Sequence, residues 1–352
     1  MNDTEIRFER RGPAGIITLD RPRALNAVTH TMVRQLAAKL GEWARDPQVG
    51  RVIIMSSSER AFSAGGDVRH LYDLGKVGHQ AEALRFWRDE YTLNTVIKRY
   101  PKPYIAMMDG ITMGGGAGIS VHGSHRIAGD RFQFAMPEAG IGFFPDVGAT
   151  WFMSRMPGEI GTYFALTGER LKAADAIAAG IVTHYVPTAR WKALLEAFAD
   201  RTPVEAALAE YAQPLDRGPI VSNQAAIDRL FAYDYVEDIM AALDREAISG
   251  SRDAGWAGAT AALIRAKSPT SLKIALGQLR RGRHMSFSEC MRTEFRIVSR
   301  IVYGEDFYEG VRAVIIDKDQ RPDWRPSTLS EVSDAVIDAY FEPLGDAELE
   351  LP

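Results

Sequence analysis

The stretch that decides the fold is Asp109-Gly110-Ile111-Thr112-Met113-Gly114-Gly115-Gly116-Ala117-Gly118-Ile119-Ser120-Val121-His122. It follows an apolar run, Tyr104 to Met108, and predicts a strand, a tight turn and the first turn of a helix. Glycine costs roughly 0.5–1 kcal/mol relative to alanine inside a regular element, so this density indicates a special backbone shape or a close approach. The free N–H donors of a helix N-terminus suit an anion or a developing oxyanion. A close helix packing contact is the alternative.

The segments before this stretch alternate between strand and helix patterns. Gly15 to Leu19 predicts a strand, and Val52 to Met55 predicts a second strand that is buried on both faces. Between them, apolar residues at three- and four-residue steps predict a helix that Thr29 or Thr31 caps and that ends near Asp46-Pro47. A strand, a helix and a second strand open an α/β fold.

Two further segments place polar groups among turn residues. Phe62-Ser63-Ala64-Gly65-Gly66-Asp67 is a second glycine-rich turn after a buried strand, with a plain surface loop as the alternative. Residues 136–148 contain Glu138 and Asp146 in an otherwise apolar segment that glycine and proline interrupt. A buried acid is costly unless it is used or paired, so both are candidate functional residues. A solvated turn for Glu138 and a helix N-cap for Asp146 are the alternatives.

The composition excludes several classes of protein. The net charge of −4 argues against binding to nucleic acid or to an anionic membrane surface. No run of 18 apolar residues occurs, and Met1 to Arg10 lacks the apolar core of a signal peptide. The single cysteine, Cys290, excludes an intrachain disulfide and is expected to be a buried thiol in a reducing compartment. A cytoplasmic location is therefore the expectation.

We expect neither a metal nor a separate cofactor. His122 and His125 are three residues apart without an evident third ligand, so a structural role is favoured. The glycine run has neither the spacing of a phosphate loop nor that of a dinucleotide fingerprint. The cluster Arg280-Arg281-Gly282-Arg283-His284 predicts a helix C-terminus, with contact to ligand phosphates as the alternative.

Taken together, Phe62 to Asp67, Gly114-Gly115-Gly116 and Pro137-Glu138 resemble the crotonase (enoyl-CoA hydratase/isomerase) superfamily. Leu19-Asp20-Arg21-Pro22 and Leu25-Asn26-Ala27 continue the resemblance. It implies an α/β fold built as a crotonase-type spiral of strand-strand-helix units, with an acyl-CoA as substrate. It also implies that the backbone N–H groups of Gly66 and Gly115 bind the thioester oxygen. Coenzyme A would then be part of the substrate, so the expected cofactor is none.

Longer segments resemble one branch of this superfamily, the 3-hydroxyisobutyryl-CoA hydrolases. These segments are residues 110–123, Glu138 with residues 142–148, and residues 317–324, so the resemblance covers nearly the whole chain. It implies hydrolysis of 3-hydroxyisobutyryl-CoA to 3-hydroxyisobutyrate and free CoA, as in valine catabolism. Glu138 and Asp146 would be the catalytic acids, and Glu90 would hold the substrate hydroxyl. Arg23, near the first strand-helix turn, is the candidate contact for the CoA phosphates.

An enoyl-CoA hydratase or isomerase is the main alternative. The hydratase pattern carries a catalytic glutamate two residues after the third glycine, and Gly118 stands there in this chain. Asp146 in turn stands where that pattern usually has a glycine. The resemblance therefore favours hydrolysis, although it leaves open whether Glu138 is a nucleophile or a general base. A non-catalytic acyl-CoA-binding protein is the second alternative.

The chain is expected to divide near residue 200. Residues 1–200 would form the crotonase core with the acyl-CoA site, and residues 201–352 a mainly helical C-terminal region that packs on it. Helical spacing recurs in this second part, at residues 223–247, 253–266, 268–280 and 286–301. Crotonase relatives commonly form trimers through C-terminal helices, and the extension of this chain could replace that contact. A homo-oligomer is therefore one of two open alternatives.

Overall fold

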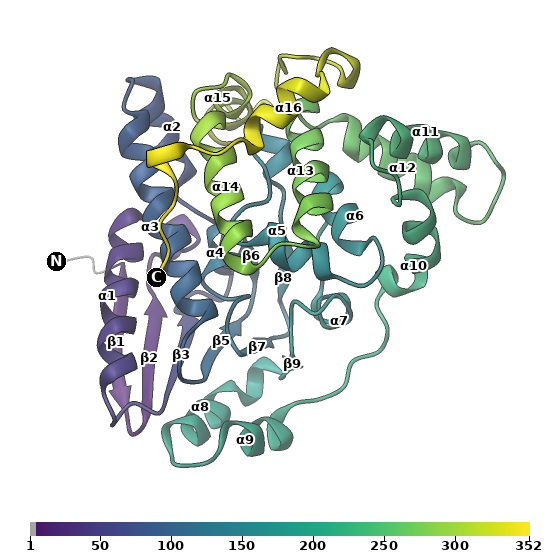
Figure 1. Cartoon of the computed structure of the whole chain (residues 1–352). Helices are drawn as coiled ribbons and strands as arrows, with labels where there is room; N and C mark the ends of the chain where they lie inside the picture. The colour runs from purple at the N-terminus through teal and green to yellow at the C-terminus, as the bar shows by residue number, and fades with distance from the viewer. Residues whose placement is uncertain (1–4) are drawn as a thin grey trace.

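The computed structural model describes residues 5–352, so the first four residues of the N-terminal segment considered above lie outside it. A six-stranded sheet runs through the molecule in the order β1-β2-β3-β5-β7-β9 (Figure 1). Its first two strands are antiparallel and all later neighbours are parallel. The strands are β1 (Ile6–Arg11), β2 (Ala14–Leu19), β3 (Arg51–Ser56), β5 (Tyr104–Met108), β7 (His125–Ala128) and β9 (His184–Tyr185). The strands predicted in β2, β3 and β5 are confirmed.

A second, three-stranded parallel sheet has the order β4-β6-β8. Its strands are β4 (Ala61–Ser63), β6 (Ile111–Met113) and β8 (Gln133–Ala135). Each follows a strand of the main sheet in the chain, as β3–β4, β5–β6 and β7–β8, and helical segments follow each pair. This repetition is the expected spiral of strand-strand-helix units, so the predicted fold class is confirmed.

The helices of the first half connect the strands and cover the main sheet. The N-terminus of α1 (His30–Arg45) is capped by Thr29, whose hydroxyl accepts the N–H of Met32 at 3.2 Å, so the first of the two predicted caps is the one used. The remaining helices of this half are α2 (Val68–Lys76), α3 (Gln80–Lys98), α4 (Gly115–Gly118), α5 (Ala149–Phe152), α6 (Ile160–Thr167), α7 (Ala173–Ala178) and α8 (Trp191–Ala199). Short 3-10 turns η1 (Pro22–Ala24), η2 (Glu138–Ile141), η3 (Met153–Arg155) and η4 (Thr188–Arg190) lie between them.

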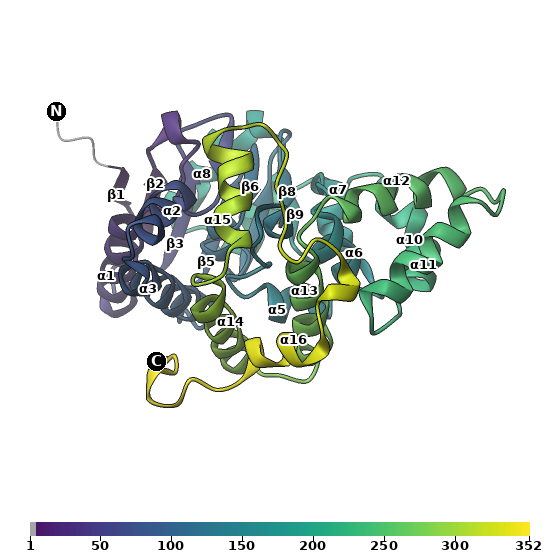
Figure 2. The same cartoon turned by 90° about the horizontal axis from the view of Figure 1, so that it is seen from above.

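The second half is helical, as expected. Its helices are α9 (Val204–Tyr211), α10 (Pro219–Leu230), α11 (Val236–Ala247), α12 (Ala254–Arg265), α13 (Pro269–Gly282), α14 (Phe287–Ile301), α15 (Asp306–Val311) and α16 (Asp334–Phe341). A π-helical turn, η5 (Arg312–Ile316), follows α15, and the 3-10 turns η6 (Leu329–Glu331) and η7 (Gly345–Ala347) lie near the C-terminus. Helices α10, α11 and α12 form the end of the molecule farthest from α1 (Figures 1 and 2). Within the described residues, no helix combines the length and the apolar character needed to cross a membrane.

The two faces of the main sheet are covered by different helices because successive strand side chains point to opposite faces. Ile16, Ile53 and Ile105 pack in one cluster with apolar side chains of α8 and α9. Ile17 and Ile54 pack instead in the large cluster that includes α1 and α3. Helix α9 lies beyond the expected boundary at residue 200 and still packs with α8 on the sheet.

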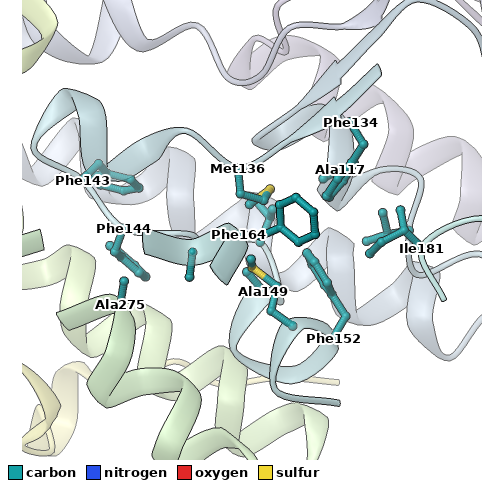
Figure 3. Packing of buried hydrophobic residues seen from close by; sticks show 14 of the residues in the cluster. Ala117, Phe134, Met136, Phe143, Phe144, Ala149, Phe152, Phe164, Ile181 and Ala275 are labelled. Carbon is teal, nitrogen blue, oxygen red and sulfur yellow. The ribbon is translucent and has the colours of Figure 1, made fainter. Parts of the chain in front are cut away.

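The C-terminal helices share the main hydrophobic core rather than a separate one. The large cluster extends in sequence from Ile6 to Leu349. Figure 3 shows Phe144 beside Ala275 of α13, in the same cluster as Ala149 and Phe152. Helices α13 and α14 therefore pack directly behind the segment that carries Asp146, while the proposed division into two regions stays a prediction.

Asn26 joins the turn after β2 to the strand β4 that leads into the first glycine-rich turn. Its fully buried side chain donates to Phe62 O at 3.0 Å and to Ser56 Oγ at 2.7 Å, and its amide oxygen accepts the N–H of Arg21 at 2.7 Å. Buried polar groups without partners are costly, so this amide fixes the path of both segments.

We expect Asn26→Ala to lower the free energy of unfolding by about 2–4 kcal/mol, because it leaves several buried partners without a hydrogen bond. Denaturant unfolding followed by circular dichroism measures this change. Asn223→Ala, at a half-exposed position in α10, is the matched control and should change stability by less than about 0.5 kcal/mol. Equal effects of the two substitutions would contradict the assigned role.

Candidate active site

Two glycine-rich turns meet at the carboxyl ends of the small sheet. Gly66 follows β4, and Gly115 is the first residue of α4 after β6. A Cβ added to Gly115 would lie 3.0 Å from the backbone nitrogen of Gly66, so the two peptide groups are close neighbours. Neither N–H donates a hydrogen bond within residues 5–352. The structure thus brings two free donors together, as an oxyanion hole requires.

The close approach explains why glycine is needed here. Gly114 turns the chain with a φ of +46°, and a Cβ on Gly116 would lie 2.6 Å from Ser63 O. A Cβ on Gly115 would lie 2.7 Å from Glu90 Oε1. Close packing therefore explains the glycines at positions 115 and 116, and the role of Gly115 as an oxyanion donor stays a prediction.

Three acids from separate elements line the same cavity as Gly66 and Gly115, which has a volume of about 780 Å³. Glu90 lies on α3, Glu138 begins η2, and Asp146 lies in the loop before α5. Their exposed fractions are only 2%, 6% and 4%. A Cβ on Gly114 would lie 3.2 Å from Glu138 Oε1, which places that carboxyl beside the two glycine turns. The acids are brought together with the proposed donors.

Asp146 does not cap a helix. The N-cap position of α5 is occupied by Gly148, and Asp146 Oδ2 instead accepts a hydrogen bond from the hydroxyl of Tyr91 at 2.8 Å. Tyr91 directly follows Glu90 on α3 and is completely buried. The sequence did not indicate this contact, because Tyr91 lies among the buried, mainly apolar residues of α3.

Burial perturbs the acidity of this group of carboxyls. Burial raises the pKa of Glu138 well above its usual range, and the charge of Asp146 raises it further. Burial also raises the pKa of Glu90, with additional effects from Asp146 and Glu294. The pKa of Asp146 is raised by burial, although the hydrogen bond from Tyr91 opposes the rise. Strongly perturbed acids in one cleft are typical of a functional site.

Glu294 of α14 is a fourth buried carboxyl that pattern analysis missed. Its two oxygens accept the N–H groups of Gly148 at 2.7 Å and Thr150 at 2.8 Å. Burial raises its pKa to about 8, and these backbone bonds oppose the rise. The available signal was an acid in the middle of a stripe of buried α14 residues that includes Met291 and Val298.

Gly118 is packed too tightly to be replaced by a larger residue. A Cβ at this position would lie 2.7 Å from Asn94 Nδ2 and 2.8 Å from Val147 Cβ. The site therefore has no space for the glutamate that the hydratase pattern carries at this position.

The remaining candidates lie elsewhere or serve the fold. Arg23 is exposed on η1 and does not line the cavity, so its contact with CoA phosphates stays a prediction. His122 bonds Val147 O at 2.7 Å, and His125 bonds Glu205 at 2.8 Å, so each has a structural partner. Arg280 bonds Glu159 at 2.8 Å. Across residues 5–352, no group of three or more His, Cys, Asp or Glu side chains is placed to hold a metal ion.

Comparison with known proteins agrees with this architecture. Residues 14–341 match the model of the enoyl-CoA hydratase/isomerase family. The chain belongs to this family. A solved structure described as a carnitinyl-CoA dehydratase from Mycobacterium thermoresistibile is 41% identical, with a TM-score of 0.92 and coverage of 99% of this chain and 98% of that one. An enoyl-CoA hydratase from Rhodobacter sphaeroides 2.4.1 is 38% identical, with a TM-score of 0.91 and coverage of 99% and 100%.

Curated relatives within this family carry a different name. The mitochondrial 3-hydroxyisobutyryl-CoA hydrolase of Danio rerio is 43% identical over 99% of this chain and 92% of its own length. The mitochondrial enzyme of the same name from Homo sapiens is 39% identical over 98% of this chain and 90% of its own length. Likeness to these hydrolases extends over nearly the whole chain, as the sequence motifs predicted.

The cytoplasmic location expected from the composition is wrong, because the curated relatives are named as mitochondrial enzymes. A single buried thiol and an ordinary charge balance distinguish a reducing from an oxidising compartment. They do not distinguish one reducing compartment from another.

The raised pKa of Glu294 predicts a pH dependence of stability. A group whose pKa is higher in the folded than in the unfolded state stabilises the fold at low pH, and that stability is lost as pH rises through the folded pKa of about 8. We expect the free energy of unfolding of Glu294→Gln to fall less than that of the wild type between pH 5 and pH 8, by roughly 1–3 kcal/mol. Denaturant unfolding at both pH values measures this difference.

The control is Glu210→Gln, which changes an exposed carboxyl on α9. Its stability should follow that of the wild type across the same pH interval. If the curves of Glu294→Gln and the wild type also ran parallel, the raised pKa of Glu294 would be contradicted.

Proposed function

We propose that the protein hydrolyses the thioester of 3-hydroxyisobutyryl-CoA to 3-hydroxyisobutyrate and free CoA. The proposal is carried by curated relatives of that name, which are 39–43% identical over nearly the whole chain. The site supports it independently, because Glu138 and Asp146 lie in one cavity with two N–H donors that have no acceptor among residues 5–352. Acyl transfer to water requires these groups: an acid or base that handles protons, and donors that stabilise the oxyanion.

The N–H groups of Gly66 and Gly115 are proposed to hold the thioester oxygen. Negative charge grows on that oxygen when the carbonyl is attacked, and one preorganised donor contributes roughly 3–4 kcal/mol to such a transition state. Both donors belong to backbone that close packing fixes, so they need no rearrangement when the charge develops. This arrangement stabilises the charge of the reaction without any side chain.

Glu138 is proposed to start the reaction by one of two routes. As a nucleophile, its carboxylate attacks the carbonyl carbon, the C–S bond breaks with release of the CoA thiolate, and water then hydrolyses the mixed anhydride. As a general base, it takes a proton from water, which attacks the carbonyl directly. In either route, Asp146 positions Glu138 or the water and assists proton transfer. The thiolate finally takes up a proton to give free CoA.

Glu90 is proposed to bind the hydroxyl of the acyl group. Its Oε1 is buried and has no hydrogen-bond partner within residues 5–352, although it lies beside Gly115. A buried acceptor of this kind favours a ligand that brings a donor. 3-Hydroxypropionyl-CoA keeps that donor and lacks only a methyl group, so it is proposed as a second substrate.

The CoA part of the substrate needs cations near the cavity. Arg21 lines the cavity but already pairs with Glu5 at 3.1 Å and Asp67 at 2.9 Å. Lys267 also lines it, and burial lowers its pKa while the charge of Glu169 opposes that shift, so we add it to Arg23 as a candidate. Assembly of the chain into a homo-oligomer also stays a proposal, which analytical ultracentrifugation would test.

Hydration of a 2-enoyl-CoA is the second candidate function. Two solved structures at 41% and 38% identity are described as a dehydratase and a hydratase, which favours it. The tight packing around Gly118 opposes it, because hydration uses a second carboxylate at that position.

One assay separates the two functions. We expect 3-hydroxyisobutyryl-CoA to release free thiol, and a 2-enoyl-CoA to keep its double bond. Glu138→Gln should reduce thiol release at least 1,000-fold while the protein stays folded, because the amide can neither attack nor take up the proton. A folded Glu138→Gln variant with near-normal turnover would refute the assignment of Glu138. Loss of the double bond without thiol release would instead identify a hydratase.

The role of Glu90 is tested by substrate preference. We expect the wild type to prefer 3-hydroxyisobutyryl-CoA over isobutyryl-CoA, which lacks the hydroxyl, and Glu90→Leu to reduce that preference in kcat/KM by about 10- to 100-fold. Glu82→Leu, at an exposed position in the first turn of the same helix, is the control and should keep it. An unchanged ratio in folded Glu90→Leu would exclude contact with the hydroxyl.

A further inference from the structure

The turn that carries Asp146 has an unfavourable backbone. Val147 has a φ of +52°, in the left-handed region, where a β-branched residue is a genuine outlier. Such a conformation persists only when the surrounding structure enforces it, and outliers of this kind cluster at functional sites. Contacts from the residues around the 145–148 turn must therefore hold Val147 in this conformation.

Every residue of this turn is held by a buried side chain from another element. Gln278 Nε2 donates to Pro145 O at 2.6 Å, and the hydroxyl of Tyr91 donates to Asp146. His122 Nε2 donates to Val147 O, and Glu294 accepts the N–H of Gly148. These four side chains bind consecutive residues, so together they determine where the Asp146 carboxyl points.

Two of the four contacts come from the C-terminal helices. Gln278 lies on α13 and Glu294 on α14, both among buried apolar neighbours, and neither side chain has any measurable exposure. An apolar residue would fill either place without the cost of burying a polar group. The hydrogen bonds from these two side chains to the turn thus offset the cost of burying them, a cost that an apolar residue at either position would avoid.

We propose that Gln278 and Glu294 are positioning residues, which hold the strained 145–148 turn so that Asp146 faces Glu138 across the cavity. The inference rests on the proposed thioester hydrolysis for its readout. It makes the C-terminal helices part of the active-site machinery, although neither residue lines the cavity. A displacement of about 1 Å in a catalytic group can reduce turnover roughly 100-fold, so loss of either contact should be visible in kcat.

Two single variants test the proposal. Gln278→Met keeps the volume, deletes the bond to Pro145 O, and also removes Oε1, which has no partner among the described residues. Glu294→Gln keeps one acceptor oxygen and turns an amide N–H₂ toward the other backbone N–H. For both, we expect kcat for thiol release to fall about 10- to 100-fold while KM stays within about 2-fold of the wild type.

The control is Thr293→Val, which removes a polar group at a buried position of α14 whose hydroxyl donates to Met285 Sδ instead of bonding the turn. It should keep kcat, while thermal melting and near-ultraviolet circular dichroism compare the folding of all variants. A kcat near the wild-type value in folded Gln278→Met and Glu294→Gln would overturn the proposal. If one variant does not fold, the other decides it by the same criterion. Absence of thiol release from the wild type would instead refute the proposed function.

Discussion

The cost of burying several carboxyls in one apolar region constrains this structure more than any other interaction. Glu90, Glu138, Asp146 and Glu294 are nearly inaccessible, and each faces at least one other acid of the group. Neighbouring carboxyls in a medium of low dielectric cannot all ionise at once, because their negative charges repel. Fewer than four of these carboxyls are therefore charged at the same time. Hydrogen bonds from Tyr91 and from the backbone of residues 148–150 lower that cost for Asp146 and Glu294. Glu90 and Glu138 each keep an oxygen without a partner among the described residues, and these two face the cavity where a substrate would bind.

The glycine turns complement these acids. The close approach of Gly66 and Gly115 leaves two N–H donors beside Glu138 that make no hydrogen bond with the described residues, which is the arrangement that the proposed oxyanion needs. The N–H ends of the two peptide dipoles and the buried carboxyls thus line the same cavity. Glu138 forms no ion pair with the described residues, and such a pair would lower its pKa and reduce its strength as a base.

Local patterns predicted the parts of the molecule whose formation depends on local sequence. The strands β2, β3 and β5, the Thr29 cap and helices α12 to α14 follow from periodicity and turn residues, and the resemblance pointed to Gly66, Gly115, Glu138 and Asp146. The helical stretch expected over residues 223–247 is instead two helices, α10 and α11. The contacts that orient Asp146 were not predictable in this way. Tyr91, Gln278 and Glu294 reach the turn from 55, 133 and 146 residues away in the chain, counted between the bonded residues, and their helices look like ordinary buried helices. Only the interruption of an apolar stripe by Glu294 hinted at its role.

The strained turn links the choice of reaction to the packing of the site. The side chain of Val147 fills the space beside Gly118, since a Cβ added to Gly118 would lie 2.8 Å from Val147 Cβ. The same turn that presents Asp146 to the cavity therefore occupies the space that a side chain at position 118 would need. A chain with this turn gains an acid at position 146 and loses room for one at position 118. Hydration with a glutamate at position 118 and the proposed hydrolysis with Asp146 would thus need different packings of one site, and the packing around Gly118 suits the proposed hydrolysis.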